Sequence, residues 1–123
     1  MWLAYQALCS LCQIHEKDLP HGDIKTENIM ITSANQLFMT DMVRFKPTYL
    51  KSNDLVNYNL FFGEMDNNQR CYFAPERFVE PAQFREGSDR DKLEHSMDVF
   101  SMGCIIAEIF MDGNTLFHLG RLQ

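Results

Sequence analysis

Residues 98–111, DVFSMGCIIAEIFM, are apolar on nearly every face of a helix, and they constrain the fold more than any other stretch. A surface helix carries one apolar stripe, whereas a helix without a polar face is buried. Asp112 and Gly113 follow directly and supply a stop, because glycine readily takes the left-handed conformation that ends helices. The 123 residues suffice for one small domain, and we expect this helix to be buried within it.

The remaining elements are one further helix and one hairpin. Residues 1–16 place apolar side chains at helical spacing, and Leu19-Pro20 ends the pattern because proline disfavours a helical residue before it. The short apolar runs Ile29–Ile31 and Leu37–Met39 flank turn-forming residues and predict a hairpin. Residues 41–76 show little periodicity and read as a long loop, and residues 80–96 read as a polar surface segment. The predicted fold is mainly α with a short β-hairpin.

Composition excludes several classes of function. A net charge of −6 argues against non-specific nucleic-acid binding, which depends on lysine and arginine. The sequence has no apolar run long enough to cross a bilayer. Cys9 and Cys12 have the spacing of a zinc half-site but lack a second pair, so we interpret them as small packing residues.

Polar residues with chemical potential gather around the predicted hairpin. If its turn centres on Ala34-Asn35, Ile29 faces Thr40 and Asn28 faces Asp41, and directly opposed side chains are close neighbours. An amide oxygen and a carboxylate at that separation suit Mg²⁺. Asp23 precedes the first strand and could accept a proton, and Lys25 could neutralise a phosphate. Phosphoryl transfer needs these parts, although a polar loop beside a surface hairpin is the plainer alternative.

Four motifs in order resemble the protein-kinase family. HGDIKTEN, residues 21–28, resembles the catalytic loop H-R-D-x-K-x-x-N, and Asp41-Met42-Val43 stands where the family has D-F-G. Ala74-Pro75-Glu76 matches A-P-E, and DVFSMG at 98–103 resembles the D-x-W-S-x-G that opens the buried helix of the larger lobe. The resemblance implies a partial C-terminal lobe of a protein-kinase-like α+β fold.

The resemblance also implies roles for individual residues. Asp23 would be the catalytic base, and Lys25, which indicates the serine/threonine class, would contact phosphate. Asn28 and Asp41 would be the Mg²⁺ ligands beside ATP. Structural roles would fall to three further residues: His21, Glu76, which normally pairs with a later arginine, and Asp98, which would anchor the catalytic loop.

Two further stretches narrow the resemblance within the family. FKPTYL at 45–50 and CYFAPERFV at 71–79 are similar to the protein-kinase subunits of class III phosphatidylinositol 3-kinase complexes. This implies three kinds of partner: the lipid-kinase catalytic subunit, an autophagy adaptor and a protein substrate. It also implies a cytoplasmic protein placed peripherally on endosomal and autophagic membranes, with no transmembrane segment.

The chain departs from the kinase pattern at three places. Gly22 replaces an arginine that normally holds an activation-loop phosphate, so we expect phosphorylation of Thr48 or Ser52 not to activate the protein. Val43 replaces the glycine of D-F-G, and a β-branched residue resists positive φ. Gln69-Arg70 stands where a threonine usually helps to tie Asp23 to Lys25.

The parts that hold ATP are missing from these 123 residues. The 123 residues contain no glycine-rich loop and no VAIK-type strand lysine, so we expect residues 1–123 to be a partial kinase domain without its N-terminal lobe. The expected parts are a first helix, the catalytic loop, an activation segment at 41–76 and the central helix. We do not expect this piece alone to be active.

Two alternatives to an active protein kinase stay open at this point. A kinase-like scaffold that regulates a lipid kinase by contact is favoured by the departures at Val43 and Gln69. An inactive truncated product is the second alternative. A small-molecule kinase would share the HGD triplet, but Lys25 and Ala74-Pro75-Glu76 argue against that class.

Overall fold

The computed structural model describes residues 1–42, 45–63, 70–82 and 92–119. Three α-helices lie in this part of the chain, with four short strands and two 3-10 turns between them. In chain order the elements are α1 (Trp2–His15), η1 (Thr26–Asn28), β1 (Ile29–Ile31), β2 (Leu37–Met39), β3 (Leu50–Lys51), α2 (Leu55–Phe62), η2 (Pro75–Arg77), β4 (Phe78–Val79) and α3 (His95–Phe110).

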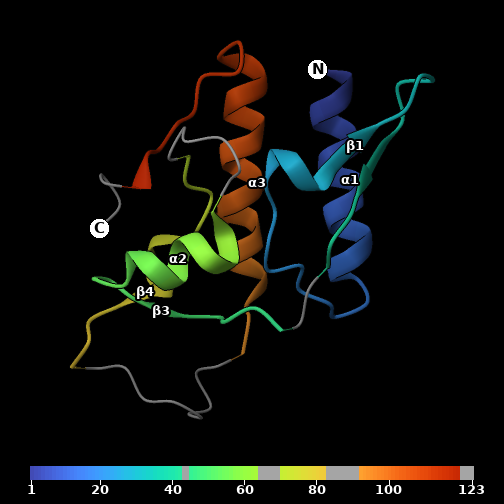
Figure 1. The fold of residues 1–123 in the computed structure, drawn as a ribbon. Helices are drawn as coiled ribbons and strands as arrows, with labels where there is room; N and C mark the ends of the chain where they lie inside the picture. The colour runs from blue at the N-terminus through green and yellow to red at the C-terminus, as the bar shows by residue number, and fades with distance from the viewer. Residues whose placement is uncertain (43–44, 64–69, 83–91, 120–123) are drawn as a thin grey trace.

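Helix α3 runs through the middle of the fold (Figure 1). Helix α1 and the β1–β2 hairpin lie on one side of it, and α2 with the β3–β4 pair lies on the other. The mainly α prediction with a short hairpin is confirmed, and so are a helix near residues 1–16 and one covering 98–110. Helix α3 begins three residues earlier than predicted, because Met97 is buried and its amide already donates to Glu94 O.

Among the described residues, one face of α3 is buried and the opposite face is exposed. Asp98, Met102 and Ile105 are buried, whereas Val99 and Phe110 are more than half exposed. The prediction of a buried helix is therefore right for the face that carries Asp98 and wrong for the opposite face. None of the helices in the described ranges has the length and hydropathy of a transmembrane span.

The hairpin has a different register from the predicted one. Ile29 pairs with Met39, not with Thr40, and Ile31 pairs with Leu37. The predicted register assumed an even turn, but the amide of Thr32 donates to Gln36 O at 2.9 Å, which leaves residues 33–35 as a three-residue loop. Asn35 in this loop takes a φ of 56°. Three-residue hairpin loops commonly need one left-handed residue at that place. Asn28 therefore lies opposite Thr40, whose amide donates to Asn28 O at 2.9 Å, and Asp41 lies one residue farther along.

Helix α1 fixes the hairpin through one glutamine. Gln6 Nε2 donates to Asn35 O at 2.9 Å, and the amide of Leu37 donates to Gln6 Oε1 at 3.1 Å. The side chain thus pairs with both polar groups that the turn presents to the helix. This contact orients the strands that lead to Asn28 and Asp41.

The segment read as a loop contains regular structure that the sequence analysis missed. Helix α2 is capped by Asp54, whose Oδ1 accepts from the amide of Asn57 at 3.1 Å. Strand β3 pairs in parallel with β4, with Leu50 opposite Phe78. The prediction of one long loop over 41–76 is therefore wrong for residues 50–51 and 55–62.

Two apolar clusters form the core. The first joins α1, the hairpin and α3 and is mainly aliphatic, with Leu11, Ile24 and Met102 among its members. The second lies around α2 and is mainly aromatic, with Tyr58, Phe62 and Phe73 in mutual contact. The catalytic-loop motif enters the first cluster through Ile24 and adjoins the second, so it lies where the two clusters meet.

Candidate active site

The HGD triplet is held from α3 by one buried carboxylate. Asp98, 1% exposed, accepts from the amide of His21 at 2.7 Å and from the amide of Gly22 at 2.8 Å. The same carboxylate contacts His15 Nε2 at 3.0 Å. Buried amides need partners, and leaving one unsatisfied costs about 1–3 kcal/mol. The loop backbone before Asp23 is thus fixed to the central helix.

The imidazole of His21 lies between the hairpin and the loop. Its Nε2 is 3.0 Å from Thr40 O, so that nitrogen carries the proton and donates. Nδ1 is then the acceptor for the amide of Asp23, at 3.3 Å. Burial lowers the pKa of His21 below its usual value, although nearby Asp98 partly opposes the shift. A neutral His21 therefore joins the last residue of the hairpin to the candidate base.

Asp23 and Asn28 are in direct contact. The Asn28 side-chain amide donates to Asp23 O at 2.8 Å and to Asp23 Oδ2 at 3.0 Å. Both residues are buried, at 6% and 5% exposure. Because the Asn28 nitrogen faces Asp23, its oxygen is directed away and is free of hydrogen bonds within the described ranges. That oxygen is the chemically suitable atom for a hard cation.

Lys25 and Asp41 lie apart from this contact. Lys25 lines a small pocket that it shares with Asp23, between the catalytic loop and the activation segment. Asp41 is exposed and takes a φ of 60°, a left-handed conformation that aspartate tolerates better than most residues. In the described part of the chain no three His, Cys, Asp or Glu side chains form a metal-binding group. Val43 and Gln69, two of the predicted departures, lie outside the described residues.

Lys46 is a site residue that the sequence analysis did not single out. Its Nζ lies 2.5 Å from Asp23 Oδ2, and the two side chains are only 17% and 5% exposed. Lys25 forms no ion pair in the described ranges, so Lys46 is the cation that contacts the candidate base there. The contact spans 23 residues, and only the placement of Lys46 in the FKPTYL stretch hinted at its importance.

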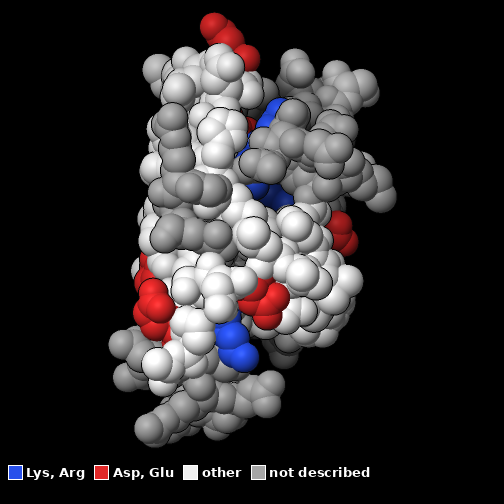
Figure 2. All heavy atoms as spheres, turned by 60° about the vertical axis from the view of Figure 1, so that its left-hand side comes forward, with Lys and Arg blue, Asp and Glu red and all other residues white. Residues whose placement is uncertain are grey.

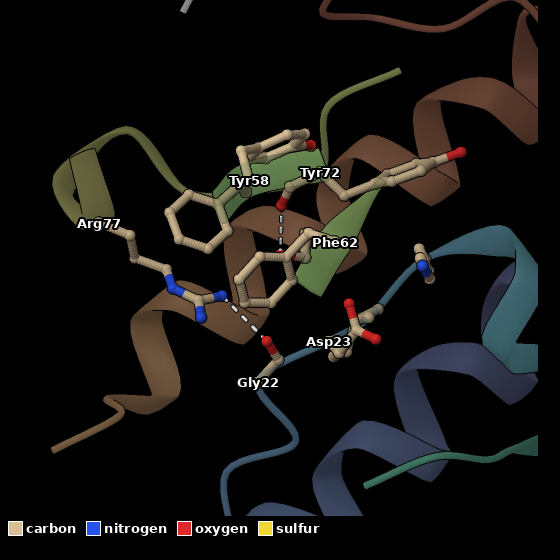
Figure 3. Close-up of a pocket in the computed structure, with 10 residues that line it drawn as sticks. Gly22, Asp23, Tyr58, Phe62, Tyr72 and Arg77 are labelled. Atoms are coloured by element: carbon tan, nitrogen blue, oxygen red, sulfur yellow. Dashed lines mark hydrogen bonds between the residues drawn. The ribbon is translucent and has the colours of Figure 1, made fainter. Parts of the chain in front are cut away.

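Arg77 is the second residue that sequence reasoning missed. Its buried guanidinium donates to Gly22 O at 3.0 Å, Thr48 O at 2.7 Å and Pro47 O at 3.2 Å. Figure 3 shows the side chain pointing at Gly22 O across the aromatic residues. Burial lowers the pKa of Arg77 to about 10, so it stays charged at neutral pH.

A side chain at position 22 would be strained. The φ of Gly22 is +81°, and a Cβ there would meet Leu93 Cδ1 at 2.6 Å. The arginine that kinases usually carry at this position would therefore strain the backbone and displace Leu93. The Gly22 peptide instead links two buried charges, because its amide donates to Asp98 and its carbonyl accepts from Arg77.

A buried carboxylate completes the polar framework. Tyr72 OH lies 2.9 Å and 3.1 Å from the two oxygens of Glu108 and 3.0 Å from Thr26 Oγ1. Burial raises the pKa of Tyr72. Glu108 is the lone acidic residue inside an apolar run, and that signal could have marked it from sequence. Glu76 is exposed and forms no ion pair within the described ranges.

Comparison with known proteins identifies the family of this chain. A family model described as the protein kinase domain matches residues 2–121. The chain belongs to the protein kinase family. Members of this family are enzymes that generally use ATP and Mg²⁺, and the confirmed fold corresponds to part of the family's α+β lobe.

Three relatives of this protein kinase chain carry closely related names. It is 45% identical over 121 residues to the serine/threonine-protein kinase VPS15 of Arabidopsis thaliana, covering 98% of this chain and 8% of the relative. The VPS15 kinase of Saccharomyces cerevisiae is 42% identical, with 98% and 8% covered. That of Schizosaccharomyces pombe is 39% identical, with 98% and 7% covered. The chain thus spans less than a tenth of these relatives.

Proposed function

We propose that residues 1–123 are part of the larger lobe of a serine/threonine protein kinase that transfers the terminal phosphoryl group of ATP to a protein hydroxyl. The contact between Asp23 and Asn28 carries this proposal. Both side chains are buried, and Asp98 fixes the backbone just before them. A polar surface loop would leave its carboxylates and amides in water, because burying them without hydrogen-bond partners is costly. Here both side chains are buried and are hydrogen-bonded to each other.

In this proposal Asp23 is the catalytic base. As the acceptor oxygen bonds to the γ-phosphorus and the bond to ADP breaks, the hydroxyl proton passes to the Asp23 carboxylate. Lys25, in the same pocket, contacts the transferred phosphate and offsets its charge. His21, Glu76 and Asp98 keep supporting roles outside the reaction itself.

The donor atoms of this chain suit Mg²⁺. Asn28 directs an amide oxygen away from Asp23, and Asp41 supplies an exposed carboxylate just beyond the hairpin. Mg²⁺ typically takes one or two carboxylates or amides together with phosphate oxygens and water. When bound, the ion would neutralise phosphate charge, and Asn28 and Asp41 are the residues that would hold it.

We also propose that the whole protein is the regulatory kinase subunit of a class III phosphatidylinositol 3-kinase complex. Identity to kinases named VPS15 supports this, as do the stretches at 45–50 and 71–79. Its partners would be the lipid-kinase catalytic subunit and an autophagy adaptor, in vesicle sorting on endosomal membranes. A scaffold that acts by contact is the second candidate, favoured by Val43 in place of the D-F-G glycine.

Phosphate transfer by the full-length protein tests the enzyme proposal. We expect Asp23→Asn to lower the rate by about 100-fold or more, the usual contribution of a general base. Asp112→Asn is the matched control, since Asp112 is exposed and asparagine tolerates its φ of 53°. Co-purification with the lipid kinase is followed in parallel. Intact complexes without Mg²⁺- and ATP-dependent transfer in the wild type would favour the scaffold.

A further inference from the structure

The candidate base has a charged neighbour that the kinase motifs do not supply. Lys46 Nζ contacts Asp23 Oδ2 at 2.5 Å, whereas Lys25, the lysine of the catalytic-loop motif, is without an ion pair in the described ranges. Both partners of the pair are mostly buried. A buried carboxylate loses hydration, and a counter-charge or hydrogen bonds must compensate for that loss. Lys46 supplies the counter-charge next to Asp23.

Lys46 is held in place by packing and by its neighbours in the chain. Its Nζ lies 5.3 Å from the centre of the Phe62 ring, a cation–π distance. The next two residues, Pro47 and Thr48, give their carbonyls to Arg77. The Arg77 guanidinium in turn stacks 3.9 Å from the Phe73 ring centre. The backbone that carries Lys46 is therefore fastened to the aromatic cluster.

The two donors engage the same oxygen of Asp23. Asn28 Nδ2 and Lys46 Nζ both reach Oδ2, and in the described part of the chain Oδ1 accepts no hydrogen bond. Fixing one oxygen from two sides sets the rotation of the carboxylate. Oδ1 is then left for an acceptor hydroxyl, and misplacement of a catalytic group by about 1 Å can cost roughly 100-fold in rate.

We propose that Lys46 is a positioning residue for phosphoryl transfer, which orients the Asp23 carboxylate and makes its geometry depend on the activation segment. This inference rests on the proposed kinase activity. Lys46 acts through Asp23 and need not touch ATP. Its effect therefore falls on kcat, while the KM for ATP stays unchanged.

Four variants of the full-length protein test the inference, with phosphate transfer measured over a range of ATP concentrations at saturating Mg²⁺, so that kcat and the KM for ATP are obtained separately. We expect Lys46→Met to lower kcat by roughly 10- to 100-fold, because methionine keeps the stem but loses the charge. Lys46→Arg should restore most of the rate. Lys17→Met, an exposed lysine in the turn after α1, is the matched control. Asp23→Asn reports on the proposed function itself.

The outcomes separate the two proposals. Wild-type rates in Lys46→Met together with inactive Asp23→Asn would overturn the role of Lys46 and leave the kinase intact. A faster Lys46→Met would also overturn it, since Lys46 would then restrain the base. A third outcome would also overturn the role of Lys46: Lys46→Met lowers the rate, Lys46→Arg does not restore it, and the amides of residues 45–51 lose protection. Lys46 would then only stabilise the segment. An Asp23→Asn variant as active as wild type would refute the kinase proposal first.

Discussion

The catalytic loop and the activation segment meet at one peptide but are built differently. The loop is bound to α3 through the carboxylate of Asp98, which accepts hydrogen bonds from the amides of His21 and Gly22. The segment is held by the guanidinium of Arg77, which donates to the carbonyls of Pro47 and Thr48. The Gly22 peptide takes part in both, through its amide and its carbonyl.

The difference shows how each region depends on its surroundings. The loop relies on the carboxylate of Asp98, which lies on α3. Because α3 contributes to the aliphatic cluster, the order of the loop depends on the folding of that cluster. The segment relies on the guanidinium of Arg77, which directly follows residues 41–76 in the chain and lies among aromatic rings. Loss of Arg77 should therefore loosen mainly the segment, because the loop loses one donor at Gly22 O while its amides stay bound to Asp98. Loss of Asp98 should loosen the loop and, through Gly22, the segment as well.

Asp98→Asn should have the largest effect. The asparagine side chain keeps one acceptor oxygen, but its NH₂ group would face a buried backbone N–H that needs an acceptor. We expect the local stability of the loop to fall by about 3 kcal/mol. Hydrogen exchange of residues 20–28 and 45–51 measures this, with Asp112→Asn as the matched control. If only 45–51 lost protection, the loop would not depend on Asp98.

Arg77→Met should have the next largest effect and should be confined to one side. Methionine keeps part of the packing against Phe62 and Phe73 but leaves three carbonyls without a donor, a loss of about 2 kcal/mol. We expect faster exchange at 45–51 and nearly unchanged exchange at 20–28. Arg77→Lys keeps the charge without the three-way fork and should lie in between. An equal increase in exchange rates at 45–51 and at 20–28 would contradict the claim that the two regions are held by different residues.

Acid should weaken the loop by a smaller amount. Burial lowers the pKa of folded His21, so the unfolded chain binds the additional proton as the pH falls below about 6.5. The contribution of neutral, buried His21 to the free energy of unfolding is complete above that pH and declines as the pH falls toward the pKa of His21 in the folded protein. Melting temperatures between pH 8 and 5 measure it. His21→Gln, which can still donate to Thr40 O, should flatten part of this dependence, and exposed His118→Gln should not.

Charges introduced into the activation segment should have the smallest effect on activity. Gly22 offers no guanidinium to a phosphate, and Arg77 is already engaged by three carbonyls. We expect Thr48→Glu and Ser52→Glu not to raise phosphate transfer, as measured on the full-length protein. A severalfold increase in either variant would show that the segment of the unmodified protein is not yet in its active arrangement.

The parts of the structure that were predictable have local causes. Helix α1 follows from apolar spacing that ends before Leu19-Pro20, and α3 follows from a long apolar run with a glycine stop at Gly113. The hairpin follows from two apolar runs around turn formers. The register was missed by one residue, since the left-handed φ of Asn35 is not fixed by residue type alone. Asp23 and Asn28 were both singled out by the HGDIKTEN motif, but the sequence analysis paired Asn28 with Asp41 and did not predict its contact with Asp23.

The parts that were not predictable depend on distant partners. Helix α2, LVNYNLFF, has no clean polar face and is held by its Asp54 cap and by rings from other segments. Its outer side exposes Val56 and Leu60, and Figure 2 shows that this side of the molecule is largely uncharged. Lys46 and Arg77 contact groups 23 to 55 residues away, and no local pattern encodes such pairs.

Hydrogen exchange of the phosphatase-treated, full-length wild-type protein tests the central claim most directly. The claim is that buried bonds meeting at Gly22 order both regions without a phosphate. It predicts slow exchange at 20–28 and at 45–51 in the unphosphorylated protein. Slow exchange at 20–28 with unprotected amides at 45–51, which become protected only after phosphorylation of Thr48 or Ser52, would contradict it.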